Sequence, residues 1–313
     1  MYLFDIRNLG LFGKKRMGLS KYLQSEEIMK EVPGRSPDDL RSYILETGLA
    51  WCAKHPDERK IVTANLEKLN LPVSDKLVED IQKHIVLHYY EKILPFGLGP
   101  EGYCDFLKTR ISIDNELAKL RACINDGKGA LIALAHFGAV EFIAPRLIAS
   151  KLPVSPALRF TTGRFSRIFQ EFGKELTRRG LAGDINFIEI GKPGTTAALD
   201  MAAALRRKEI LVTVFDEKTD YSTPVTLFGT RVWGGAGLDK LITFVRSPIA
   251  VFNAFIIRTG INTFTFKLSA VPLEATDPIQ SMFSNLEGVV RDHMNQWYFL
   301  HEQIPFVENN TQE

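Results

Sequence analysis

The chain has 313 residues, of which 45% are hydrophobic and 24% are charged, and its net charge is +2. The composition is that of an ordinary globular protein. The length is sufficient for one large domain or for a domain with an appendage. The near balance of charge gives no overall attraction to nucleic acid, so a nucleic-acid partner is not expected. Three scattered cysteines without a Cys-x-x-Cys pair or metal-ligand spacing favour a reducing compartment.

The amino terminus does not have the pattern of a membrane span or of a signal peptide. No stretch approaches the ~18 uninterrupted apolar residues of a span, and Asp5 and Arg7 interrupt the first apolar run. We therefore expect a cytoplasmic protein, either water-soluble or peripherally bound at the inner membrane face. Residues 3–16 combine apolar side chains with a basic cluster at 14–16, which could make weak contact with an anionic membrane. An irregular arm packed on the domain is the simpler interpretation, because glycines interrupt this segment.

Residues 1–126 have helical patterns throughout and are expected to form an amino-terminal helical region. Ser36 before Pro37 marks one helix start, because a serine cap and a first-turn proline are favourable there. Other helices are expected to begin at Pro56, Ser74 and Asp114. No strand-like run interrupts this part of the chain.

From residue 127 to residue 313 short apolar runs alternate with helical stretches. The expected strands are 129–135, 185–190, 210–215 and 249–256. The expected helices are about 141–151, 163–180, 195–208, 236–246 and 279–299. Such alternation predicts an α/β core with a mostly parallel mixed sheet covered by helices. Residues 263–271 alternate in polarity and are expected to form an antiparallel hairpin with the preceding strand at a sheet edge. The helical region and this core are expected to form one continuous globular unit.

The strongest chemical signal is the segment His136-Phe-Gly-Ala-Val-Glu141, between an expected strand and an expected helix. On one helix these two side chains would point about 140° apart, so contact requires a strand-turn-helix elbow, which Gly138 permits. Glu141 would then lie at a helix start, where the macrodipole favours a negative charge and disfavours a charged His136. The pair can act as a general base and its orienting acid. The alternative is a histidine bonded to neighbouring backbone and an ordinary helix-start glutamate.

Other residues carry candidate chemistry of a less specific kind. Arg159 follows an apparent strand, and Arg164 belongs to the arginine-rich segment after it. Arginine binds phosphate through planar, bidentate bonds, although for most of this segment a solvated helix face is the alternative. Asp216 ends a buried strand, at the edge where α/β sheets present ligands, but it could instead bond the next turn. His84 and His88 are four residues apart without an evident third ligand, which favours a surface pair over a metal site.

The order of motifs resembles the late lipid A acyltransferases (lauroyl- and myristoyl-transferase type) of the lysophospholipid acyltransferase superfamily. The resemblance covers most of the chain. Its segments are Glu58–Leu66, His136-Phe-Gly with Glu141, Phe215-Asp216-Glu217, Pro224–Gly229, Val290-Arg291 and Gln296-Trp297-Tyr298. The chain departs from the family in lacking the usual amino-terminal spanning helix. It also has Ala139-Val140 in place of Asn-Trp and Asp216-Glu217 in place of Asp-Gln.

The resemblance implies acyl transfer from an acyl carrier protein or coenzyme A thioester to a hydroxyl or amine, with no bound cofactor and no metal. His136 would be the general base, and Glu141 would orient its ring. Together with the residue patterns described above, the predicted substrate-binding residues are Gly138, Arg159, Arg164, Asp216 and Glu217. The acceptor could be a glycolipid or a soluble or carrier-tethered intermediate of specialised metabolism. A thioester hydrolase and a non-catalytic acyl-chain binding protein are the alternatives. The chain has no Gly-x-Ser-x-Gly elbow, which agrees with transfer without an acyl-enzyme.

Overall fold

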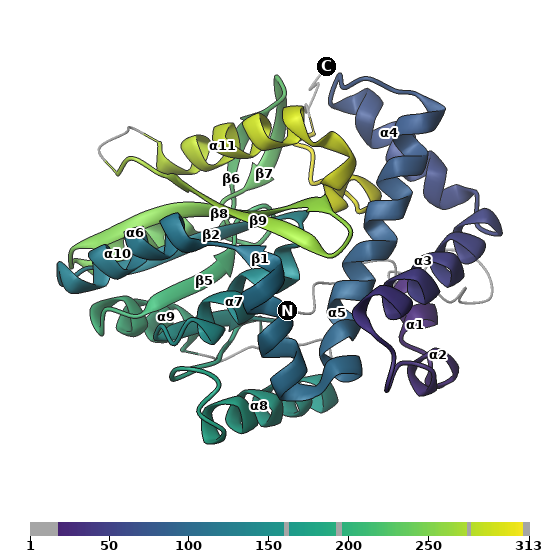
Figure 1. The fold of residues 1–313 in the computed structure, drawn as a ribbon. Helices are drawn as coiled ribbons and strands as arrows, with labels where there is room; N and C mark the ends of the chain where they lie inside the picture. Colours follow the sequence, from purple (N-terminus) through teal and green to yellow (C-terminus); the bar gives the residue numbers. More distant parts are fainter. Residues whose placement is uncertain (1–17, 160–162, 192–195, 274–276, 309–313) are drawn as a thin grey trace, which may run out of the picture.

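A seven-stranded sheet forms the centre of the protein, with helices around it (Figure 1). The computed structural model describes residues 18–159, 163–191, 196–273 and 277–308, without the side chains of 163–169. The strand order is β1-β9-β8-β2-β5-β3-β4, and the described pairs are parallel except β8 with β9. This confirms the predicted mostly parallel α/β fold with an amino-terminal helical region. The predicted contact of residues 3–16 with a membrane lies outside the described residues.

The central strands are apolar along their whole length. The sheet consists of β1 (Ile111–Ser112), β2 (Gly129–Gly138), β3 (Val154–Leu158), β4 (Ile188–Glu189), β5 (Ile210–Val214), β8 (Ile249–Gly260) and β9 (Thr263–Ala270). A separate antiparallel hairpin consists of β6 (Thr223–Leu227) and β7 (Thr230–Gly234). Every residue of β2, β3 and β5 is buried, because helices cover both faces of the sheet there.

Two helices of the amino-terminal region begin where the serine caps predict. Its helices are α1 (Leu19–Leu23), α2 (Glu26–Lys30), α3 (Pro37–Ala53), α4 (Asp57–Lys68), α5 (Asp75–Arg110) and α6 (Asp114–Asn125). The hydroxyl groups of Ser36 and Ser74 accept hydrogen bonds in the first turns of α3 and α5. The long helix α5 runs past the edge of the sheet at which the parallel strands end (Figure 1), and it kinks at Gly99, whose φ is +65°.

The helices of the second part follow the strands in sequence. They are η2 (Val140–Phe142), α7 (Ile143–Ala149), α8 (Gly163–Arg178), α9 (Ala197–Arg206), α10 (Leu238–Val245), α11 (Pro278–Asp292), η3 (Met294–Gln296) and η4 (Tyr298–His301). Within the part of the chain that the structure describes, no helix has both the length and the apolar character needed to cross a bilayer.

Three sequence expectations are corrected. The region before residue 126 contributes β1, which pairs with β9, so the confirmed β8–β9 hairpin lies one strand in from the sheet edge. Strand β1 has only two residues, which are too few to produce a periodic pattern in the sequence. The closing helix ends at Asp292, because Trp297 pairs with Phe137 of β2 and draws the chain back to the sheet. The expected strand 185–190 is reduced to Ile188–Glu189.

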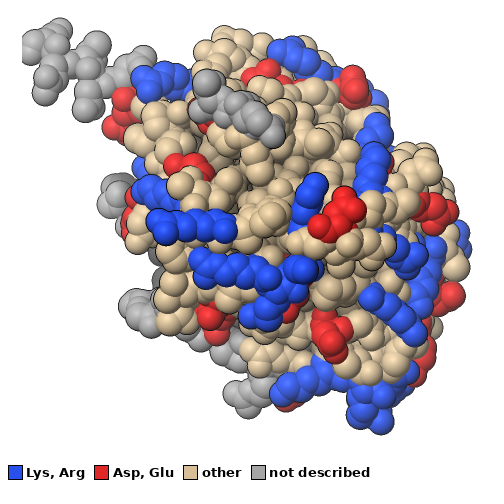
Figure 2. All heavy atoms as spheres, turned by 90° about the vertical axis from the view of Figure 1, so that its left-hand side faces the viewer, with Lys and Arg blue, Asp and Glu red and all other residues tan. Residues whose placement is uncertain are grey.

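The two ends of the parallel strands differ in charge. Exposed Lys128, Lys151, Lys208 and Arg246 each shortly precede one of the strands β2, β3, β5 and β8. Figure 2 shows Lys and Arg gathered on the side of the molecule at which these strands begin. The opposite end of the strands faces α5 and holds buried polar groups.

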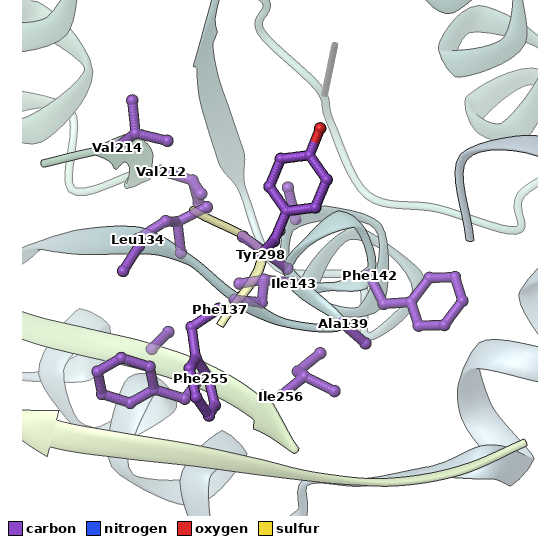
Figure 3. Packing of buried hydrophobic residues seen from close by; sticks show 14 of the residues in the cluster. Leu134, Phe137, Ala139, Phe142, Ile143, Val212, Val214, Phe255, Ile256 and Tyr298 are labelled. Atoms are coloured by element: carbon purple, nitrogen blue, oxygen red, sulfur yellow. The ribbon is translucent and has the colours of Figure 1, made fainter. Parts of the chain in front are cut away.

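The core continues from the sheet into the turn after β2. Figure 3 shows Leu134 and Phe137 of β2 among side chains of β5 and β8, with Phe142 and the Tyr298 ring nearby. The labelled aliphatic and aromatic side chains are all buried. The segment that carries His136 is therefore packed from the sheet, from α7 and from η4.

Candidate active site

Residues from three separate segments meet at the edge where the parallel strands end. His136 lies near the end of β2, and Asp216 and Glu217 follow its neighbour β5. Arg159 follows β3, which is the next strand beyond β5. Neighbouring strands lie about 4.8 Å apart, so the strand order places these side chains side by side, as is typical of ligand sites in open α/β sheets.

Asp216 holds His136 with both of its carboxylate oxygens. Oδ1 accepts a hydrogen bond from the ring Nδ1 at 2.7 Å, and Oδ2 accepts one from the His136 backbone N–H at 2.7 Å. Because the carboxylate only accepts, the proton of the neutral ring lies on Nδ1 and the lone pair is on Nε2. Burial lowers the pKa of His136, but the neighbouring carboxylates, with Asp216 foremost, outweigh burial and the net pKa is raised. This is the geometry of a histidine base with an orienting acid.

The turn that follows β5 is fixed by the backbone. The N–H of Phe215 donates to the Leu134 carbonyl at 2.9 Å, and the Gly235 N–H donates to the Phe215 carbonyl at 2.7 Å. Gly235 has φ of +85°, and a Cβ there would crowd Ile279. The residue before Asp216 is therefore held from β2 on one side and from the end of β7 on the other.

Glu141 lies elsewhere, which corrects the predicted His136–Glu141 pair. Its Oε1 is 3.5 Å from His88 Nε2 and 3.7 Å from Lys92 Nζ, both on α5. The turn η2 directs the carboxylate toward α5, while β5 supplies an acid to Nδ1 of His136. His88 is fully buried, so it does not form a surface pair with His84.

Glu217 faces the other ring nitrogen of His136. Its Oε1 lies 3.6 Å from Nε2, and its side chain is 19% exposed. Burial raises the pKa of the Glu217 carboxyl, and the charges of His136 and Arg159 only partly oppose that rise. The basic nitrogen therefore faces a carboxyl group at the border with solvent.

Three further residues predicted to bind substrate, Arg159, Arg164 and Gly138, have different surroundings. Arg159 is half-buried, and its guanidinium packs on Gly191, where a Cβ would collide with it. Arg164 is in the first turn of α8, and its side chain lies outside the described residues. Gly138 has φ of +60°, and a Cβ there would collide with the Ile256 carbonyl, so the tight turn requires glycine. Substrate binding by these residues stays a prediction.

An aromatic cover lies over the His136 ring. Phe299 stacks on it with ring centroids 4.9 Å apart, and Tyr298 follows at 6.2 Å. The Asn65 amide donates to the carbonyls of Leu300 and Glu302 at 2.8 Å, which ties the end of η4 to α4. Sequence reasoning assigned no role to these residues, although Asn65 and Tyr298 lie within the resembling segments.

An apolar cavity adjoins this edge of the sheet. It encloses about 870 Å³ of space, part of which is open to solvent at its mouth. Rings and aliphatic side chains of α5, α7, β3, α8 and residues 185–187 form most of its wall; among them are Phe96, Tyr103, Ile148, Leu158, Phe172 and Phe187. Its charged lining residues are Glu91, Lys92 and Glu141. Sequence reasoning missed Glu91 and Lys92, although charges within the apolar run 85–94 could have signalled them.

No family model matches the chain, and a search of curated proteins finds no significant match. Within the described ranges, no group of three or more His, Cys, Asp or Glu side chains is arranged to hold a metal ion.

Proposed function

We propose that the protein is an acyltransferase that moves an acyl group from a carrier-protein or coenzyme A thioester to a hydroxyl or amine acceptor. The observation that carries this proposal is the buried His136–Asp216 pair, with its basic Nε2, at the strand edge where the turn after His136 lines an apolar cavity through Val140 and Glu141. A base next to an apolar cavity suits a substrate with a long hydrocarbon chain and a reactive end.

In the proposed reaction Nε2 of His136 removes the proton of the acceptor hydroxyl or amine. The acceptor oxygen or nitrogen forms a bond to the thioester carbonyl carbon. The resulting tetrahedral intermediate breaks its C–S bond, and the thiolate takes the proton back from Nε2. Asp216 keeps the ring in the required tautomer and stabilises the imidazolium between these steps.

The acyl chain would lie in the apolar cavity. Each buried methylene contributes about 0.8 kcal/mol, so the length and width of the cavity would select chain length. Glu217 would contact the acceptor, because it faces Nε2 at 3.6 Å. Arg159 would bind a phosphate of the donor or of the acceptor.

The proposal needs no resident cofactor, since the thioester is a co-substrate. We propose a cytoplasmic location, with the inner membrane face as the place of any peripheral contact. The free thiols of Cys104 and Cys123 support a reducing compartment.

A thiol-release assay tests the proposed function. The protein would be mixed with acyl carrier protein and coenzyme A thioesters of several chain lengths, with and without hydroxyl and amine acceptors. Release that depends on an acceptor and is lost in His136→Ala supports acyl transfer. The matched control is His55→Ala, because His55 stacks on Trp51 within the helical region. Acceptor-independent release would instead indicate a hydrolase, and binding without release would indicate an acyl-chain binding protein.

A further inference from the structure

A second pocket opens at the same sheet edge, on the side of β2 opposite to β5. It holds about 680 Å³ including its mouth. Its lining is polar and comes from several elements; it includes Arg41 of α3, His84 and Glu91 of α5, Arg258 of β8, and Asn295 of η3. Glu91 also lines the apolar cavity, so the two cavities share a wall.

Arg258 organises this pocket. Its Nε donates to Glu91 Oε1 at 2.7 Å, and its Nη2 donates to the Gly138 carbonyl at 3.0 Å. Its Nη1 lies 3.2 Å from Nδ1 of His84. A guanidinium only donates, so Nδ1 accepts and the His84 proton lies on Nε2. Burial, and next the positive charge of Arg258, lower the pKa of His84 to about 3. The His84 ring is therefore neutral.

Two polar groups of the pocket have unused bonding capacity. Glu91 is 1% exposed, and its Oε2 has no hydrogen-bond partner. Among the described residues, the half-buried Arg41 guanidinium has no ion-pair or hydrogen-bond partner. A buried oxygen without a partner is costly, and a ligand that fills the pocket would remove that cost.

We propose that this pocket binds a phosphate group of the acceptor, an inference that rests on the proposed acyltransferase function. A phosphate presents oxygens in several directions, and donors of α3, α5 and β8 line the pocket around it. The guanidinium groups of Arg41 and Arg258 suit such an anion. Burial raises the pKa of Glu91 to about 7, so its carboxyl can carry a proton and donate through Oε2. With Glu91 neutral, the two guanidinium charges balance a phosphate dianion.

The position of the pocket favours the acceptor over the donor as the source of the phosphate. Gly138, which Arg258 contacts, is two residues from His136, at most about 7 Å along the chain. The phosphate of a phosphopantetheine arm is separated from its thioester by two amide units. A phosphate held this near to the base therefore fits an acceptor whose nucleophile is a short distance from its phosphate.

Direct binding tests the site without any turnover. Inorganic phosphate would be titrated into the full chain by calorimetry, with chloride at equal ionic strength as the reference. We expect Arg41→Gln to weaken binding at least tenfold, because a charge-assisted contact is lost. Asn295→Ala, on another wall, should weaken it less. The control Arg121→Gln removes an equal charge from the exposed face of α6 and should leave binding unchanged.

Inhibition kinetics then identify the source of the phosphate. Inorganic phosphate should compete with the acceptor and not with the acyl donor, and Arg41→Gln should raise the acceptor KM. Competition with the donor would overturn the assignment to the acceptor. A wild-type chain that binds no phosphate, or binds it equally well in the well-folded Arg41→Gln and Asn295→Ala variants, would overturn the site. Phosphate binding without acyl transfer would overturn the proposed function, and with it the acceptor assignment, but not the anion site.

Discussion

The two cavities at the carboxyl edge of the sheet differ in kind, although α5 lines both. The cavity toward β3 and α8 has rings and aliphatic side chains, whereas the pocket beyond β8 has guanidinium, imidazole and amide groups. Adjacent residues of a helix point about 100° apart, so Glu91 and Lys92 of α5 reach different neighbours. Glu91 pairs with Arg258 on the polar side, and Lys92 approaches Glu141 on the apolar side.

This difference suggests how one edge could hold two unlike substrates. A hydrocarbon chain is stabilised by apolar area removed from water, whereas a charged group requires hydrogen-bond partners when it is buried. His136 lies on β2, between β5 and β8 in the sheet, where the reacting ends of the two substrates would meet. If this assignment is correct, variants at the base and in each cavity should affect acyl transfer in different ways.

The largest effect is expected from His136→Ala, which removes the base and leaves both cavities intact. Acyl transfer should fall by ~10²- to 10⁴-fold, the usual contribution of general acid–base catalysis. Thiol release and product formation would be measured together with acyl-chain and phosphate binding. The variant should keep both binding activities. Retention of more than about a tenth of the turnover would remove His136 from the mechanism.

The next largest effect separates the two candidate acids. Asp216→Asn should lower kcat by about 10²-fold or more, because the amide cannot stabilise the imidazolium. Glu141→Gln should lower it less than about tenfold, since that carboxylate contacts His88 and Lys92. The reverse order would restore the His136–Glu141 pair inferred from the sequence.

The pH dependence of acyl transfer gives a second test of the role of Asp216. Transfer requires neutral His136, and the Asp216 carboxylate raises its pKa against the effect of burial. The acidic limb of the wild-type profile should therefore lie at a higher pH than an ordinary histidine would give. In Asp216→Asn this contribution is absent, so the limb should move to lower pH, whereas Glu141→Gln should leave it in place.

A feature of this site can be predicted from the sequence when the residues that form it lie close together along the chain. Local signals located the caps at Ser36 and Ser74 and the end of a strand shortly before Asp216. The His136–Asp216 contact depends on β5 lying next to β2, with β3 and β4 beyond it, and that order joins residues 80 apart in sequence. Local spacing instead favoured Glu141, because it is the nearest acid along the chain after His136.

A smaller effect is expected from filling the apolar cavity. Ala144 of α7 lines it, and Ala144→Leu would occupy part of its volume. The preferred acyl chain should become shorter, because each methylene displaced from the cavity costs about 0.8 kcal/mol, or about fourfold in kcat/KM. Competition between thioesters of different length would measure the shift. Leu199→Phe on the exposed face of α9 is the control, and an equal loss for every chain length would argue against this cavity as the acyl site.

The smallest effect is expected at Arg159, which lies on the β3 side of His136 and away from the polar pocket. Its guanidinium packs on Gly191, and its charge partly opposes the rise that burial causes in the pKa of Glu217, the carboxyl group that faces Nε2 of His136. Arg159 therefore lies on the side from which a substrate would reach Nε2. Arg159→Ala should raise the KM of one substrate by up to about threefold with little change in kcat, since a half-buried contact made equally in the ground and transition states affects binding alone and only modestly. A rise in the donor KM would assign Arg159 to the thioester, just as Arg41 is assigned to the acceptor. A rise in the acceptor KM in both variants would mean that the two arginines serve one substrate, and the proposed separation across β2 would fail.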